Sequence, residues 1–135
     1  VPPYEPDGQY HGTSAALEFA VRDLKVKHII VLGHSHCGGI RCLCDGHEDG
    51  AEREFIDRWV SIVDEARDDT PQGAAQHRHV ERQAVKISIR NLLSFPWVKA
   101  QVEDGSLELH GWWFDLEAGE LLAHKDGDIW EAATA

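Results

Sequence analysis

The sequence predicts an α/β fold in which a mainly parallel central sheet is flanked by helices. A short apolar run at 28–32 is typical of a strand that is covered on both faces in a parallel sheet. Two amphipathic stretches, at 51–67 and 76–93, predict helices that cover such a sheet. With 135 residues, of which 42% are hydrophobic, the chain fits one compact domain over 1–135.

The first segments of the chain are an arm and a helix. Residues 1–12 are rich in Pro, Gly and Asp without an apolar period, which predicts an extended arm. From Thr13, a suitable N-cap, apolar residues follow at near-helical spacing as far as Leu24. We therefore expect a first helix over this stretch.

The remaining elements follow from similar patterns. The strand at 28–32 stops at Gly33, and the long helix at 76–93 stops before Pro96. A short helical turn is expected through Val98 and Val102, and alternating residues at 107–114 and 120–124 predict two strands joined by a short turn.

Charge and composition exclude several classes of partner. The formal net charge of −11 argues against nucleic acid and anionic membrane surfaces. No stretch reaches the roughly 20 apolar residues of a membrane span, and the first residues lack the pattern of a signal peptide. We therefore predict a soluble, cytoplasmic chain. Its three cysteines lie close together, which favours metal binding or reduced thiols over disulfides.

A candidate metal site follows the strand at 28–32. His34 and Cys37 offer an imidazole and a thiolate, both good zinc ligands, in a glycine-rich turn where a strand ends. Open α/β sheets bind their ligands at the carboxyl ends of strands. Two ligands are too few for a catalytic zinc, which usually has three protein ligands and water.

The same residues are open to other interpretations. A serine hydrolase elbow needs glycine where this chain has Cys37. A cysteine phosphatase loop needs more residues between Cys37 and Arg41, because its backbone amides surround a phosphate. In the purely structural interpretation, Cys37 is a small buried hydrophobe and His34 a hydrogen-bonded polar residue of a strand-to-helix turn.

The wider sequence resembles β-class carbonic anhydrases. The similarity runs through Gly12 to Val21, Gly33 to Ile40 and Glu81 to Leu93, and it continues through Phe95 to Val98 and Gly105 to Trp112 with Gly119 to Leu121. Order and spacing agree over nearly the whole chain. The resemblance implies a β-carbonic-anhydrase-like α/β fold and reversible, zinc-dependent hydration of carbon dioxide to bicarbonate. It also implies homodimers or larger homo-oligomers.

The resemblance assigns roles to four positions. It implies that His34 and Cys37 are two of the Zn²⁺ ligands. Gly38 would offer its backbone N–H to bicarbonate, and Phe19 would help to wall a small apolar pocket for carbon dioxide. Helix start and core packing are the structural alternatives for Gly38 and Phe19.

One segment of the family pattern has no counterpart in this sequence. The upstream Cys-x-Asp-x-Arg motif supplies a third zinc ligand and an Asp-Arg pair, so we expect an incomplete domain without its first strands and without an assigned catalytic residue. A second hypothesis is therefore a non-catalytic remnant or assembly module on the same scaffold. A third is a zinc- or thiol-sensing protein built on Cys37, Cys42 and Cys44, although packing is the preferred role for the last two.

Overall fold

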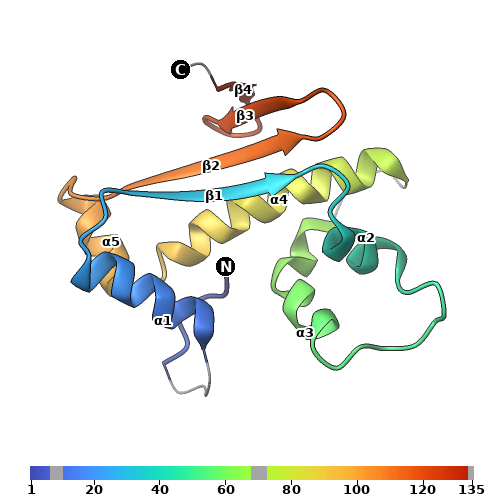
Figure 1. Ribbon diagram of the computed structural model, residues 1–135, viewed down its shortest axis with the longest axis horizontal. Helices are drawn as coiled ribbons and strands as arrows, with labels where there is room; N and C mark the ends of the chain where they lie inside the picture. Colours follow the sequence, from blue (N-terminus) through green and yellow to red (C-terminus); the bar gives the residue numbers. More distant parts are fainter. Residues whose placement is uncertain (7–10, 68–72, 134–135) are drawn as a thin grey trace.

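The computed structural model describes residues 1–6, 11–67 and 73–133 of the chain. Helices flank one sheet that contains a parallel strand pair (Figure 1), which confirms the predicted α/β class. The elements in chain order are α1 (Gly12–Glu18), the π-helical η1 (Phe19–Asp23), β1 (His28–His34), α2 (Gly38–Asp45), α3 (Ile56–Val60), the 3₁₀-helical η2 (Ser61–Arg67), α4 (Ala74–Leu92), α5 (Pro96–Glu103), β2 (Glu108–Asp115), β3 (Glu120–His124) and β4 (Trp130–Ala132).

The described sheet has four strands in the order β1-β2-β3-β4. β1 and β2 are parallel, with His28 opposite Glu108 and His34 opposite Phe114. β2, β3 and β4 form successive antiparallel pairs, so the sheet is mixed. The strands expected at 28–32, 107–114 and 120–124 are present, and β4 is an additional strand that the sequence pattern did not predict.

α4 packs closely against the parallel pair, and two glycines make this approach possible. A Cβ atom added at Gly33 would lie 2.6 Å from Cγ2 of Val85, and one at Gly111 would lie 3.0 Å from Cγ1 of the same residue. Val85 itself is buried. Any residue other than glycine at position 33 or 111 would therefore intrude on the space that the Val85 side chain occupies.

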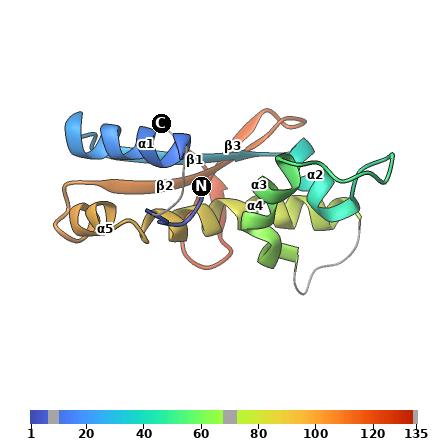
Figure 2. The same ribbon diagram turned by 90° about the horizontal axis from the view of Figure 1, so that it is seen from below.

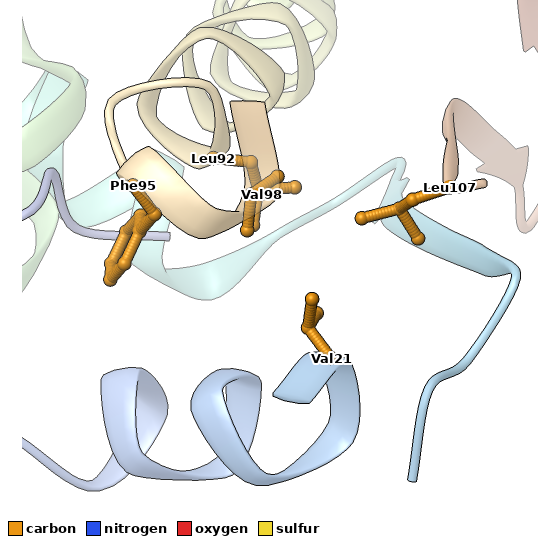
Figure 3. Packing of buried hydrophobic residues seen from close by; sticks show 5 residues of the cluster. All are labelled: Val21, Leu92, Phe95, Val98 and Leu107. Carbon is orange, nitrogen blue, oxygen red and sulfur yellow. The ribbon is translucent and has the colours of Figure 1, made fainter. Parts of the chain in front are cut away.

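The main hydrophobic cluster joins helices to the covered face of the sheet. Figure 3 shows five of its buried side chains, which are Val21, Leu92, Phe95, Val98 and Leu107. Ile29, Val31 and Leu109 of the two parallel strands pack against this cluster from the sheet. η1, the end of α4 and α5 are thereby fixed to one face of the β1–β2 pair, as Figure 2 shows from below.

The opposite face of β1 is open, and here the prediction of a strand covered on both faces is wrong. Exposed and half-buried residues alternate along β1, and Ile30 and Leu32 are 47% and 60% exposed. Ile29 and Val31, on the other face of β1, are the residues that pack against the main hydrophobic cluster. A continuous run of apolar residues therefore does not by itself show that this chain covers both faces of the strand.

Two helix starts differ from the expected ones. α1 begins at Gly12 with His11 as its N-cap, so Thr13 lies inside the helix. The helix expected over 51–67 is shorter, because the Asp57 carboxylate accepts the Arg53 backbone N–H at 2.7 Å and contacts the His47 ring nitrogen at 2.6 Å. These bonds hold 47–55 as a loop. Non-helical backbone at Val63, inside η2, interrupts the helical path a second time.

The arm predicted at 1–12 has neither helix nor strand over 1–6, while 7–10 lie outside the described residues. Asn91 donates its side-chain N–H to the Val1 carbonyl at 2.8 Å, and the Tyr4 backbone N–H donates to Ser94 Oγ at 2.8 Å. The Tyr4 ring meets Phe95 edge to face. The start of the chain thus lies along the end of α4.

Replacing Gly33 by alanine should destabilise the chain by about 1–3 kcal/mol, because the new methyl group overpacks the Val85 contact. Urea unfolding measures this change. Gly12→Ala is the matched control, since a Cβ there meets no atom within 4 Å. The same Gly33 substitution should cost less in a Val85→Ala background, and an equal cost in both backgrounds would refute the steric explanation.

Candidate functional site

The candidate metal ligands lie where β1 passes into α2. His34 is the last residue of β1, and Cys37 is the N-cap residue of α2 with extended backbone. Residues 35–37 turn the chain between them, beyond the arrowhead of β1 in Figure 1. The structure thus places His34, Cys37 and Gly38 together at the carboxyl end of a parallel strand, the position at which open α/β sheets bind ligands.

The turn is attached to the end of β2. The Ser35 backbone N–H donates to the Phe114 carbonyl at 2.9 Å, and Ser35 Oγ accepts the Leu116 N–H at 2.8 Å. His36 has a φ of 58°, in the left-handed region that only a few residue types adopt readily. Its Nε2 lies 3.2 Å from a Glu117 carboxylate oxygen, so the His36 ring is directed to the β2–β3 turn.

Asp115 stabilises the β2–β3 turn that holds these residues. Hydrogen bonds from the Ala118 and Glu117 backbone N–H groups, together with the nearby Arg78 charge, lower the pKa of the Asp115 carboxyl. A carboxyl whose pKa is lower in the folded state stabilises it above the ordinary pKa, and the contribution is lost as the pH falls through the lowered value. The contribution of Asp115 to the turn is therefore present at neutral pH.

Glu81 of α4 holds the backbone of Cys37. Glu81 is only 4% exposed, and its Oε1 accepts the Cys37 N–H at 3.1 Å. A buried carboxylate needs such partners, because burial without hydrogen bonds is costly. The bond also fixes the N-terminal end of α2 relative to α4.

A hydrogen bond to the backbone orients the His34 ring. Nδ1 lies 2.8 Å from the Ser35 carbonyl oxygen, which can only accept a hydrogen bond. Nδ1 must therefore carry the proton, and the neutral ring presents its lone pair at Nε2. Metal-binding histidines characteristically have such a bond at the second ring nitrogen, because it sets the tautomer and the ring orientation.

Two of the three cysteines pack against the same hydrophobic cluster. Cys37 and Cys44 are partly buried against the second hydrophobic cluster, whose buried members include Ile40 and Val63. Burial raises the pKa of the Cys44 thiol, and the neighbouring Asp45 adds to this effect. A raised pKa disfavours the thiolate that binds metal, so the structure agrees with packing as the role of Cys44.

Space for a small ligand exists at Gly38. A Cβ added there would meet nothing within 4 Å, whereas one at Gly39 would approach Val60 at 3.3 Å. The N–H of Gly38 belongs to the first turn of α2, where backbone donors have no intrahelical acceptor. The position is thus compatible with the bicarbonate contact expected for it.

Phe19 lies away from the other predicted site residues. It belongs to η1, is 57% exposed, and lines a surface hollow with Ala15 and Arg22. Figure 1 shows α1, which leads into η1, near the start of β1, while α2 lies beyond its end. The seven residues of β1 span roughly 20 Å. The chain therefore does not bring Phe19 to His34 and Cys37.

A zinc ion fits the donors at this turn, with two ligands from the described residues. His34 offers an oriented imidazole nitrogen and Cys37 a partly buried sulfur, and both are preferred zinc ligands. In the described part of the chain, neither His34 nor Cys37 belongs to a group of three His, Cys, Asp or Glu ligand atoms within 4.8 Å of one another. A cavity of about 910 Å³ adjoins the turn and is lined by Cys37, Glu81 and Arg82 but not by His34.

Comparison with known proteins decides the family. The family profile described as carbonic anhydrase matches residues 1–121. This chain belongs to the β-carbonic anhydrase family. It is 40% identical over 155 aligned residues to beta carbonic anhydrase 5, chloroplastic, of Arabidopsis thaliana, with 96% of this chain and 51% of that protein covered.

Solved structures of β-carbonic anhydrases have the same fold. The β-carbonic anhydrase CcaA superposes with a TM-score of 0.87 at 26% identity and covers 100% of this chain and 63% of its own. A structure of two tetrameric β-carbonic anhydrases from Sordaria macrospora gives a TM-score of 0.75 at 27% identity, with 94% and 66% covered. The chain thus spans about half the length of the curated relative that it matches.

Some features of this β-carbonic anhydrase site could not be found from the sequence. Glu81 lies in a polar run of a helix, where a carboxylate normally faces solvent, and Ser35 resembles any turn serine. Their roles depend on which elements pack together.

No helix of the described residues is long and apolar enough to cross a membrane.

Glu81→Ala should leave the Cys37 N–H without its acceptor and loosen the start of α2. We expect a loss of about 1–3 kcal/mol in unfolding free energy, typical of a buried donor left unsatisfied. Faster hydrogen exchange at the Cys37 amide, measured by NMR, should accompany this loss. Glu81→Gln retains an acceptor oxygen and should exchange more slowly than the alanine variant; equal rates would exclude the proposed contact.

Proposed function

We propose that the full-length protein catalyses the zinc-dependent, reversible hydration of carbon dioxide to bicarbonate. The observation that carries this proposal is the His34 ring, whose Nδ1–H bond to the Ser35 carbonyl leaves the Nε2 lone pair free for a metal, three residues before Cys37 in the turn. Family membership supplies the reaction class. His34 and Cys37 would hold the metal as two of its protein ligands.

The residues around the turn would prepare the site. Bound zinc supplies a Lewis acid that makes water acidic near neutral pH. Glu81 and Ser35 hold the turn rigid through the Cys37 and Leu116 backbone N–H groups. The Gly38 N–H would donate to an oxygen of bicarbonate, and the open space at Gly38 would admit this small anion.

The alternative is a non-catalytic assembly module on the same scaffold. It is favoured by one observation, namely that His34 and Cys37 belong to no group of three ligand atoms within 4.8 Å of one another among the described residues. The enzyme hypothesis requires this ligand, and the groups that orient water, from outside the described part of the chain. Zinc content and activity therefore distinguish the two hypotheses.

Phe19 fits the carbon dioxide pocket only through a second copy of the chain. It is exposed, and its helix η1 contributes Val21 to the cluster against which Ile29, near the start of β1, packs, so its own His34 at the other end of β1 is beyond its reach. We therefore propose a homo-oligomer in which one protomer lends Phe19 to the site of another. The tetrameric enzymes of Sordaria macrospora support the existence of such assemblies in this family.

The compartment of the protein stays a prediction. The chain was expected in the cytoplasm from its composition, whereas the Arabidopsis relative is named as chloroplastic. We retain the cytoplasm as a proposal, which imaging of the tagged full-length protein tests.

Replacing either proposed ligand should abolish zinc binding and activity together. In the full-length protein, His34→Ala and Cys37→Ser should each reduce hydration by at least a hundredfold, measured by stopped-flow, and lower zinc per chain in elemental analysis. Cys42→Ser is the matched control and should retain both. Full activity in His34→Ala would refute His34 as a zinc ligand, and bound zinc without activity in the unmodified protein would favour the assembly module.

A mixed oligomer tests the role of Phe19. Chains carrying His34→Ala are combined with chains carrying Phe19→Ala by denaturation and refolding together. If Phe19 acts across the interface, mixed oligomers contain some sites with both residues intact, and activity should exceed the mean of the two separate variants. Activity equal to that mean would place Phe19 in the site of its own chain or outside any site.

A further inference from the structure

A second group of potential metal ligands lies at the other end of the parallel strand pair. His28 is the first residue of β1, and Glu108 is the first residue of β2. They are register partners, and His110 lies two residues after Glu108 on the same face. Since His28 and Ile30 also share a face, these three side chains project from the open side of the sheet.

The ligand atoms of this group lie close together. His28 Nδ1 is 3.1 Å from His110 Nε2, and a Glu108 carboxylate oxygen is 3.8 Å from each of these nitrogens. In the described part of the chain this is the one group of three His, Cys, Asp or Glu ligand atoms within 4.8 Å of one another. The three atoms form a compact triangle that faces solvent.

The triangle has nearly the dimensions of a metal coordination sphere. Metal–nitrogen bonds of about 2.0–2.1 Å place neighbouring ligand atoms roughly 3.3 Å apart in a tetrahedral site. The nitrogen pair at 3.1 Å fits this spacing, and the carboxylate needs to approach by a few tenths of an ångström. The Glu108 side chain is 65% exposed, so it has the freedom to do so.

We propose that His28, Glu108 and His110 form a binding site for a divalent transition-metal ion. Two imidazoles and one carboxylate suit Zn²⁺, Ni²⁺ or Cu²⁺, whereas Mg²⁺ and Ca²⁺ prefer oxygen ligands. The site is separate from His34 and Cys37, because β1 spans roughly 20 Å between His28 and His34. It also has no thiolate, so it differs in ligand chemistry.

The strand pairing holds the ligands near these positions before an ion binds. The Glu108 N–H donates to the Lys27 carbonyl at 2.9 Å, which fixes the start of β2 beside β1. Without an ion, one imidazole donates its N–H to the other across the 3.1 Å gap. With an ion, both nitrogens turn their lone pairs to the metal, and the carboxylate offsets part of its charge.

Other histidine–carboxylate pairs of the chain offer an internal comparison. His47 with Asp57 and His77 with Asp45 are also in contact, at 2.6 and 3.0 Å. Neither pair belongs to a group of three ligand atoms among the described residues. The proposed site should therefore bind an ion before these pairs do.

Nickel titration tests the proposal. Every protein in the series carries Cys37→Ser, which removes thiolate binding at the first site, and Ni²⁺ is added during isothermal titration calorimetry. We expect about one Ni²⁺ per chain, with affinity at least tenfold weaker in His28→Gln and in His110→Gln. The control His79→Gln, at an exposed histidine of α4, should bind as the parent does.

Paramagnetic broadening locates the ion independently of any substitution at the site. Substoichiometric Ni²⁺ should broaden the ring signals of His28 and His110 in NMR spectra before those of His47 and His77. The proposal is overturned if Ni²⁺ does not bind, if both glutamine variants retain the parental affinity, or if only one of them loses it. Simultaneous broadening of all four rings overturns it as well.

Discussion

The close contact between α4 and the parallel strands is the constraint on which the site depends. Val85 fits against Gly33 and Gly111, and Glu81 lies one helical turn earlier on the same face of α4. The steric fit that sets the depth of the helix therefore also sets where the Glu81 carboxylate meets the Cys37 N–H. Packing of a core residue and positioning of the proposed metal ligand Cys37 are thus consequences of one helix–sheet contact.

Local patterns predicted much of the fold and the centre of the site. The run at 28–32 and the long apolar period of α4 are strong signals, because each depends only on neighbours in sequence. His34 and Cys37 could be placed at a strand end for the same reason. Their spacing alone left several chemistries open, and the family resemblance separated these possibilities.

Local sequence patterns could not predict features that depend on residues far apart in the sequence. The exposure of Ile30 depends on which helices cover the sheet, and the shortened α3 depends on bonds between Asp57 and a preceding loop. His28 and His110 are 82 residues apart, and only the register of the parallel pair brings them together. Phe19 matched the family motif in sequence, yet its helix η1 precedes β1, whereas His34 lies at the far end of that strand.

The exposed edge of β1 can associate with other chains, and long-range electrostatic repulsion between the chains opposes this association. In the described sheet β1 is an edge strand, and unpaired edges with apolar neighbours tend to pair with other chains. The net charge of −11 opposes unspecific encounters between such edges. Salt at physiological strength confines this repulsion to about 8 Å. In dilute buffer, repulsion between the chains therefore slows encounters between two such edges. In salt the repulsion is screened, so the selection of a partner depends on shape and hydrogen-bond complementarity.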